Sequence, residues 1–358
     1  MRIGDAGPDA TRSATRERAQ STMSSRHVDS AGRRLRDLRV SITDRCNFRC
    51  TYCMPRKVFK AGFPFLPRSE LLTFEEIERV VRAAAALGVQ KVRLTGGEPL
   101  LRREVERLVA ALSAVPGIEV ALTTNGALLA TKAQALKAAR LDRVTVSLDS
   151  LDDAVFKGMN DVGVSVSRVL AGIAAAQEAG LTPIKINAVV KRGVNEASVL
   201  PLARHFRGTR HVIRFIEFMD VDNTNGWRMD DVVTADELLT QIATEFPLEA
   251  IPAAYPGEVA SRYRYKDGGG EVGVIASVTR PFCGSCTRAR LSADGKLHTC
   301  LFASTGHDLR RLLRSGCSSQ ELKESLAGVW QARDDRYSEL RTAGIATSPR
   351  VEMSYIGG

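Results

Sequence analysis

The sequence has no apolar run of about 18 residues, the length that a helix needs to cross a bilayer, anywhere in its 358 residues. It also lacks the short apolar core of a secretory signal near its start. These two absences predict a cytoplasmic protein that does not associate with membranes. The rest of the composition, 44% apolar and 26% charged, is ordinary for a globular protein with a sizeable core.

Aromatic residues are few and scattered, at 6% of the chain. The formal charge is 51 − 41 = +10, which favours a polyanionic partner, either nucleic acid or a small phosphorylated substrate. A zinc-bearing protein that binds nucleic acid is therefore one alternative function. The simplest explanation of the charge is an ordinary basic surface. Proteins of the first kind usually interleave aromatic and basic residues on one face. The scattered aromatics argue against that alternative, so no nucleic-acid partner is expected.

Regular alternation of apolar residues is missing from residues 1–33, which predicts a disordered basic tail. From about Arg39 to residue 220, six β-rich segments alternate with amphipathic helical ones. The segments are "RVSIT", "KVRLT", "EVALTT", "RVTVSLD", "IKINAVV" and "VIRFIEFM". In the first helical segment, Thr73 and Glu76 form a capping box and Gly88 is a stop signal. Strands that alternate with helices predict parallel pairing with right-handed crossovers.

The sequence has neither a G-x-G-x-x-G loop nor a Walker loop after its first strand. An open doubly wound sheet would usually carry one, so the pattern favours an α/β fold of the partial (β/α)₆ TIM-type barrel kind. In such barrels the chemistry lies at the carboxyl ends of the strands. The barrel is predicted over 34–240 and a smaller C-terminal domain over 241–345. A tail over 346–358 ends in Gly-Gly.

A fourth cysteine is missing from each of two cysteine clusters. The first is Cys46-x₃-Cys50-x₂-Cys53 and the second is Cys283-x₂-Cys286-x₁₃-Cys300, while Cys317 stands alone and reads as a small apolar side chain. Three thiolates cannot close a tetrahedral zinc site. Each triad therefore either borrows a distant ligand or leaves one position of an iron–sulfur cluster open.

Two zinc alternatives follow from the first possibility. The first triad would be a zinc knuckle that borrows a distant His or Cys. The second triad would be a Cys₃His ribbon that uses His298 or His307.

The segment "TDRCNFRCTYCMP" followed by "RLTGGEPLLRR" resembles the radical S-adenosylmethionine (SAM) superfamily. The added motifs "TTNG", "VSLDSLD", "RFIEFM", "FCGSCTRARLSADGKLHTCLF" and the terminal "GG" resemble its GTP 3′,8-cyclase (MoaA) family. That likeness extends from about Arg34 to Gly358. It implies a lyase-type radical SAM cyclase that acts at the first step of molybdenum cofactor biosynthesis. A peptide-modifying radical SAM enzyme with an auxiliary cluster is the nearest alternative.

The resemblance also implies roles for individual residues, which the spacing alone does not give. Two 4Fe-4S clusters would be held by Cys46, Cys50, Cys53, Cys283, Cys286 and Cys300. SAM would be bound by Tyr52, Gly97, Ser147 and Met219. GTP would be bound by Arg39, Arg93, Thr124, Lys185, Arg288, Ala289 and Arg290. Arg39, Arg288 and Arg290 would also act in catalysis.

In the reaction that the resemblance implies, a 5′-deoxyadenosyl radical removes the 3′ hydrogen of GTP. The resulting sugar radical attacks C8 of guanine, and reduction gives 3′,8-cyclo-7,8-dihydro-GTP. The second cluster is expected to bind the guanine, and the Gly357-Gly358 tail is expected to reach into the site. The implied partners are a reducing protein as electron donor and the next enzyme of the pathway as acceptor of the product. A homodimer is left open.

Overall fold

The computed structural model describes residues 27–221, 224–342 and 350–357. The strands are β1 (Asp37–Ser41), β2 (Lys91–Thr95), β3 (Glu119–Thr124), β4 (Arg143–Ser147), β5 (Lys185–Val190), β6 (Val212–Glu217), β7 (Leu248–Ile251), β8 (Ser261–Tyr265), β9 (Glu271–Ile275), β10 (Arg288–Leu291), β11 (Lys296–His298) and β12 (His307–Asp308). The helices are α2 (Phe74–Ala85), α3 (Val105–Ser113), α4 (Leu129–Ala138), α5 (Asp153–Asn160), α6 (Val166–Glu178), α7 (Val199–Phe206), α8 (Ala235–Ala243), α9 (Leu309–Arg314), α10 (Ser319–Gln331), α11 (Tyr337–Thr342) and α12 (Met353–Ile356).

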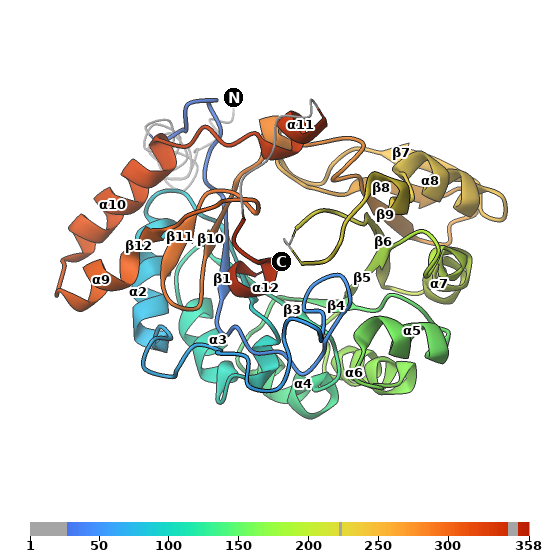
Figure 1. Cartoon of the computed structure of the whole chain (residues 1–358), viewed down its shortest axis with the longest axis horizontal. Helices are drawn as coiled ribbons and strands as arrows, with labels where there is room; N and C mark the ends of the chain where they lie inside the picture. The colour runs from blue at the N-terminus through green and yellow to red at the C-terminus, as the bar shows by residue number, and fades with distance from the viewer. Residues whose placement is uncertain (1–26, 222–223, 343–349, 358) are drawn as a thin grey trace, which may run out of the picture.

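The strands form one sheet in the order β12-β11-β10-β1-β2-β3-β4-β5-β6-β9-β8-β7. The six strands expected from the sequence, β1 to β6, pair in parallel and in chain order. The sheet curves around the centre of the molecule, helices α2 to α8 lie outside it, and the short helix α12 lies at the centre (Figure 1). The predicted α/β partial barrel is therefore confirmed.

The C-terminal part of the chain extends this sheet at both sides. Strand β9 pairs in parallel with β6, and β10 pairs in parallel with β1. Antiparallel strands follow outside each of them, β8 and β7 on one side and β11 and β12 on the other. The second cysteine triad thus adjoins β10 and β11, which belong to the same sheet as the strand that precedes the first triad, β1. The division of the chain near residue 240 stays a prediction.

Alternation along the strands separates the apolar core from the inner face. In β1, Leu38 and Val40 are fully buried in the core cluster, whereas Arg39 points to the inner face, where it lines the cavity described below. The predicted capping box of α2 is present, because Thr73 accepts from the N–H of Glu76 and Glu76 accepts from the N–H of Thr73. Local signals therefore fix both the start of this helix and the face that it buries.

Residues 27–33 correct the prediction of a disordered tail over 1–33, of which 1–26 lie outside the described residues. Val28 forms a β-bridge with Arg34, and Asp29 and Arg33 are buried, at 4% and 5% exposure. Their partners lie about 300 positions along the chain, since Arg333 also contacts Asp29. A segment without apolar periodicity is held here by ion pairs, which local patterns do not reveal.

Candidate functional site

Both cysteine triads line one cavity of about 320 Å³ inside the curved sheet. The first triad follows the carboxyl end of β1, and the "GGE" segment follows β2. The second triad lies just before β10 and just after β11. All six cysteines of the two clusters therefore lie on the same enclosed space, although they are about 240 positions apart in the chain.

The first triad occupies a tight turn. The N–H groups of Cys53 and Met54 both donate to the carbonyl of Cys50, at 3.0 and 2.9 Å, and the N–H of Phe48 donates to Sγ of Cys46 at 3.4 Å. Burial raises the pKa of Cys46 to about 12 and raises that of Cys50 well above its usual value. Because only the thiolate is a good metal ligand, metal binding here must displace these protons.

Gly96 and Gly97 allow the loop after β2 to lie directly against the start of the cysteine loop. The N–H of Gly97 donates to the carbonyl of Thr43 at 2.8 Å. A Cβ on Gly96 would overlap the carbonyl oxygen of Thr43, and one on Gly97 would overlap that of Arg45. The glycine pair is therefore required by backbone packing, and it also places Gly97 on the wall of the cavity.

The second triad lies among cations. Nη2 of Arg288 is 3.3 Å from Sγ of Cys286. Burial by itself would raise the pKa of Cys286, but Arg288 and Arg333 outweigh it and lower that pKa to about 6. Among the described residues no cation is recorded so close to Cys300, and burial raises its pKa to about 12. One thiol of this triad is thus prepared as a thiolate before any metal binds.

A single zinc ion and an iron–sulfur cluster require different spacings of their cysteine ligands. In the part of the chain that the structure describes, no three His, Cys, Asp or Glu side chains lie close enough to hold one metal ion. Ligands of a single zinc ion share one small tetrahedron with Zn–S bonds of about 2.3 Å. Cysteines that bind different irons of one cluster can lie farther apart. His298 does not line the cavity, and its Nδ1 lies 3.1 Å from the carbonyl of Thr305.

Six arginines line the cavity: Arg39, Arg93, Arg214, Arg288, Arg290 and Arg333. Several of them bond to neutral groups. Arg93 donates to the hydroxyls of Thr123 and Thr145, both at 3.1 Å, and Arg214 donates to Asn187 at 2.9 Å. The inner face therefore carries positive charge that hydroxyl and amide partners do not neutralise.

Burial and mutual repulsion perturb these arginines. Burial, followed by Arg290 and Arg288, lowers the pKa of Arg39 well below its usual value, and Nε of Arg39 is buried without a hydrogen-bond partner among the described residues. Burial and Arg288 likewise lower the pKa of Arg290 to about 10. Like charges held together in this way indicate a binding site for a polyanion.

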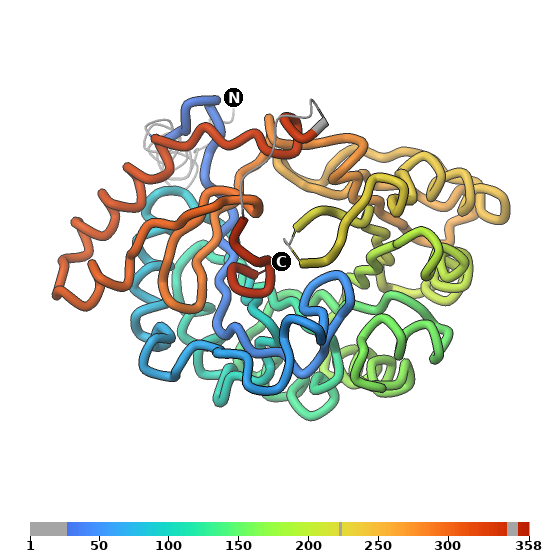
Figure 2. The backbone as a smooth tube through the Cα atoms, viewed as in Figure 1, coloured from blue at the N-terminus to red at the C-terminus, as the bar shows by residue number. Residues whose placement is uncertain are grey.

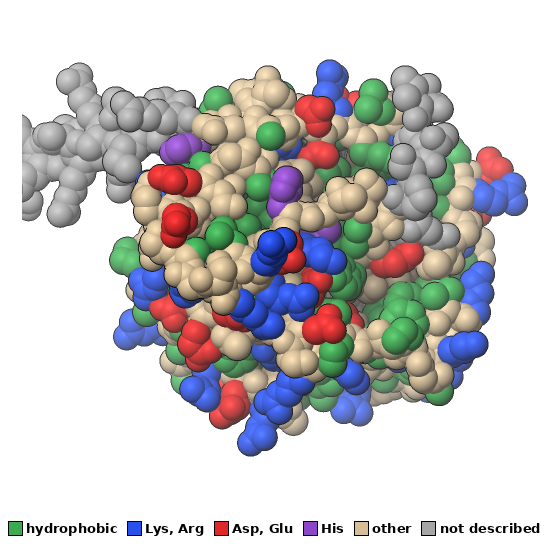
Figure 3. Space-filling model, turned by 60° about the vertical axis from the view of Figure 1, so that its left-hand side comes forward, with side chains coloured by type: hydrophobic (Ala, Val, Ile, Leu, Met, Phe, Trp, Pro, Cys, Tyr) green, Lys and Arg blue, Asp and Glu red, His purple; other side chains and the backbone are tan. Residues whose placement is uncertain are grey.

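Basic groups on the outer face are balanced instead. Over the face that carries α9 and α10, Lys and Arg side chains are interspersed with Asp and Glu (Figure 3). On this side Arg314 pairs with Glu76 at 2.8 Å, and Arg310 lies 3.7 Å from Glu70. The paired outer charges differ from the crowded arginines of the cavity.

The four residues predicted to bind SAM all line the cavity: Tyr52, Gly97, Ser147 and Met219. The hydroxyl of Tyr52 donates to Oδ2 of Asp149 at 2.8 Å, which fixes the ring beside the first triad. Met219 directly follows Phe218, which is 2% exposed, at the carboxyl end of β6. The structure thus brings together four residues that lie at or beyond the carboxyl ends of four different strands.

Of the residues predicted to bind GTP, five line the cavity: Arg39, Arg93, Thr124, Arg288 and Arg290. Ala289 and Lys185 do not line it. Ala289 is 1% exposed and packs in the core with Leu38, its partner in the sheet register. Lys185 lies on the side of β5 that carries Asn187, nearer the strand's start, and burial together with Arg214 lowers its pKa to about 7.

Sequence reasoning missed several polar residues of the cavity wall, among them Arg214, Glu98 and Asp149. Arg214 stands in the middle of the apolar segment "VIRFIEF", and that interruption was the available signal. Glu98 accepts from the N–H groups of Leu100 and Asn125 and from the hydroxyl of Thr124. Burial raises the pKa of Glu98 to about 7 and that of Asp149 to about 6. Burial thus makes both acids easier to protonate than ordinary carboxyl groups.

The C-terminal segment reaches the same cavity. Helix α12 contacts β1, and the red end of the tube lies at the centre of the molecule beside the blue N-terminal strand (Figure 2). Met353 and Ser354 line the cavity, Ile356 is fully buried, and the carbonyl of Gly357 accepts from Nη1 of Arg290. The predicted tail of two glycines is described up to Gly357, while Gly358 lies outside the described residues.

Two family models match the chain, "Radical SAM superfamily" over residues 40–206 and "Molybdenum Cofactor Synthesis C" over residues 211–339. A GTP 3′,8-cyclase of Acidothermus cellulolyticus is 54% identical, and the match covers 92% of this chain and 98% of the relative. A GTP 3′,8-cyclase of Staphylococcus aureus is 48% identical over 335 residues, with the same coverage of each chain.

Among solved structures, Streptococcus suis SuiB bound to S-adenosylmethionine superimposes with a TM-score of 0.62 over 95% of this chain and 75% of that one. The two sequences are 15% identical. At that identity the likeness shows the fold alone. No helix in the described ranges is both long and apolar enough to cross a membrane.

Proposed function

The chain belongs to the GTP 3′,8-cyclase family of the radical SAM superfamily, and we propose that its cavity converts GTP into 3′,8-cyclo-7,8-dihydro-GTP. The observation that carries the proposal is that two open cysteine triads and six arginines line one enclosed space. A metal site with an open position can bind a reactant, and crowded buried arginines fit a triphosphate, which carries about three to four negative charges. One cavity therefore offers a place for both reactants.

We assign the first triad to a 4Fe-4S cluster that binds SAM, with Tyr52, Gly97, Ser147 and Met219 around it. When bound and reduced, this pair would supply a 5′-deoxyadenosyl radical. The residues of the chain would hold and orient the cluster and SAM. Asp149 fixes Tyr52 through a hydrogen bond of 2.8 Å, and Thr43 and Arg45 fix the glycine loop.

We assign the second triad to another 4Fe-4S cluster that faces the guanine base, with the triphosphate among the arginines. Arg39 and Arg290 lie side by side in the register of β1 and β10, and Arg93 follows in β2. Each guanidinium offers paired donors that match phosphate oxygens. Thr124 already donates to Glu98, so its contact with GTP in this proposal would use the oxygen as an acceptor. Positioning of the sugar between the two triads is the main task of these residues.

Three further elements belong to the proposal. Lys185 would reach the ligand from the start of β5, where burial keeps its pKa near 7. Ala289 would contribute through its backbone, because its side chain faces the core. A reducing protein would deliver the electrons, and the next enzyme of the pathway would take the product.

Turnover tests the cofactor and the substrate together. We expect reconstituted protein with SAM and a reductant to release 5′-deoxyadenosine in the presence of GTP and to release little without it. The amounts of 5′-deoxyadenosine and cyclised nucleotide are measured by chromatography. Equal release with an unrelated peptide, and none with GTP, would instead favour a peptide-modifying enzyme of the same fold.

The iron content tests the two clusters separately. We expect about eight iron and eight sulfide per chain after anaerobic reconstitution, since each cluster contains four of each. Replacing Cys283, Cys286 and Cys300 by Ala should lower both numbers to about four. Stoichiometric zinc without sulfide would contradict the assignment of both triads.

A further inference from the structure

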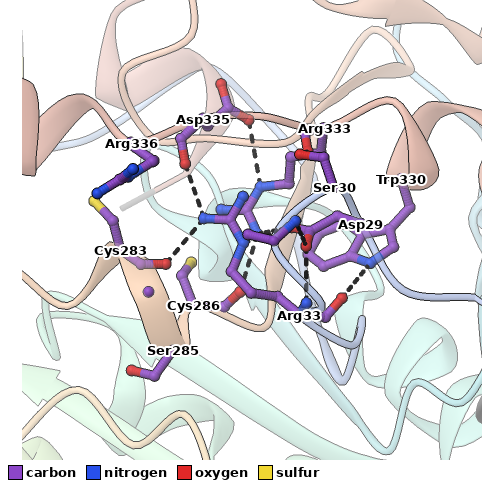
Figure 4. Close-up of polar contacts among 12 residues, drawn as sticks. Asp29, Ser30, Arg33, Cys283, Ser285, Cys286, Trp330, Arg333, Asp335 and Arg336 are labelled. Atoms are coloured by element: carbon purple, nitrogen blue, oxygen red, sulfur yellow. Dashed lines mark hydrogen bonds and ion pairs between the residues drawn. The ribbon is translucent and has the colours of Figure 1, made fainter.

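A buried ion cluster lies beside the loop that carries Cys283 and Cys286 (Figure 4). It consists of Asp29 and Arg33 from the N-terminal segment and Arg333 from the segment after α10. Their side chains are 0%, 2% and 2% exposed. Asp29 lies 2.5 Å from Nε of Arg33 and 3.4 Å from Nη1 of Arg333. One carboxylate therefore holds two guanidinium groups together.

The two guanidinium groups bond to the backbone of the cysteine loop. Nη1 of Arg33 donates to the carbonyl of Cys283 at 2.9 Å, and Nη1 of Arg333 donates to the carbonyl of Cys286 at 2.9 Å. The loop between these cysteines has only a single 3₁₀ turn, Cys283–Ser285. These two charge-assisted hydrogen bonds therefore hold the loop from outside, together with the bond of 3.1 Å from the N–H of Gly284 to Oε1 of Glu339.

The ion cluster is itself enclosed. Trp330, at 2% exposure, donates from Nε1 to the carbonyl of Arg33 at 3.0 Å, and its ring lies 4.7 Å from the guanidinium of Arg333. Ser30 donates to the carbonyl of Arg333 from both its N–H and its hydroxyl, at 3.3 and 2.6 Å. Arg33 also donates to the carbonyl of Asp335 at 2.8 Å. Burial of this kind keeps the charges close to the triad and weakly screened by solvent.

We propose that Asp29, Arg33 and Arg333 are positioning residues for the second cluster, and that Arg333 also adjusts its reduction potential. The inference rests on the proposed second cluster. A cluster with three thiolates becomes more negative when it is reduced, so nearby positive charge favours the reduced form. Residues 28–34 are in this way part of the site, although they lie more than 240 positions before its first cysteine.

The test uses the full chain with Cys46, Cys50 and Cys53 replaced by Ala, so that only the second triad can hold a cluster. In this parent we compare Arg333→Gln, Arg333→Lys and Asp29→Asn. Arg311→Gln is the matched control, because it removes one positive charge from the exposed surface of α9. The readouts are iron and sulfide per chain, the reduction potential from a titration followed by electron paramagnetic resonance, and the melting curve.

We expect the parent and Arg311→Gln to hold about four iron per chain at the same potential. Arg333→Gln should shift the potential to a more negative value and bind less iron. Arg333→Lys keeps the charge but lacks the planar fork, so it should keep the potential and lose part of the iron. Asp29→Asn removes the carboxylate that pairs with Arg33 and leaves Arg333 with Asp335 alone, at 3.3 Å, so this variant should lose most of the iron.

Two results would overturn the inference, and they can be told apart. If the parent binds no iron or sulfide, the proposed second cluster is wrong and the inference fails with it. If the parent is loaded, but Arg333→Gln and Asp29→Asn match Arg311→Gln in iron content and potential, the ion cluster has no role in the site. The Arg333→Lys variant keeps the test valid where a neutral variant does not fold.

Discussion

Gly357→Ala should lower cyclisation of GTP about 10- to 100-fold and leave the iron content of both triads unchanged. Gly357 has a φ of +79°, and a Cβ there would overlap the hydroxyl of Thr95. The four-residue helix α12 holds this end of the chain more weakly than the sheet holds Thr95, so the tail is the part that should move. Its bond to Arg290 would then be lost, and a hydrogen bond to a charged group contributes about 1.5–3 kcal/mol.

Gly316→Ala is the control for this variant. Gly316 has a similar φ of +82°, and nothing lies within 4 Å of an added Cβ. The Gly316→Ala variant therefore introduces a similar backbone strain without the overlap that Gly357→Ala causes at the cavity. Cyclised nucleotide, 5′-deoxyadenosine and iron are measured for both variants. Wild-type cyclisation by Gly357→Ala would show that the position of the tail is not required.

Arg39→Gln should weaken GTP binding about 10- to 100-fold without lowering the melting temperature of the ligand-free protein. The affinity should fall because a charge-assisted contact of about 1.5–3 kcal/mol is removed. The stability should not fall, because Arg39 is crowded by Arg288, Arg290 and Arg93, and burial already disfavours its charge. A loss of function that accompanies constant or greater stability distinguishes a binding residue from a structural one.

Arg204→Gln provides the matched control for Arg39→Gln. Arg204 lies on the outer helix α7, is 58% exposed and pairs with Glu245 at 2.6 Å, so its loss changes the net charge equally. GTP affinity is measured by calorimetry and stability by thermal unfolding. A fall in melting temperature or in iron content for Arg39→Gln would place Arg39 in the fold and not in ligand binding.

The sequence was most informative where the signal is local. Alternation of strands and helices predicted β1 to β6, because apolar periodicity depends only on neighbouring residues. The capping box at Thr73 and Glu76 was readable for the same reason. The missing fourth cysteine of each triad and the likeness of the motifs predicted the family, which the relatives confirm.

The site depended on contacts between distant segments. Strand register and side-chain direction decide that Arg214 faces the cavity and that Ala289 faces the core. The packing of Gly97 on Arg45 depends on how two loops meet. The spacing of residues in the sequence does not predict these side-chain directions, since a shift of one residue along a strand exchanges the two faces of the sheet.

By itself, the sequence determined the class of fold, the positions of the six cysteines and the family, because each is written in short motifs and periodic patterns. Only the tertiary structure decided that both triads share one cavity. It also decided that two residues of the predicted tail belong to the site, because Asp29 pairs with Arg333 and Arg33 donates to the carbonyl of Cys283. The physical reason is that a buried charged side chain is stable only when an opposite charge or hydrogen-bond partner lies beside it. Such partners can be 300 positions apart in the chain.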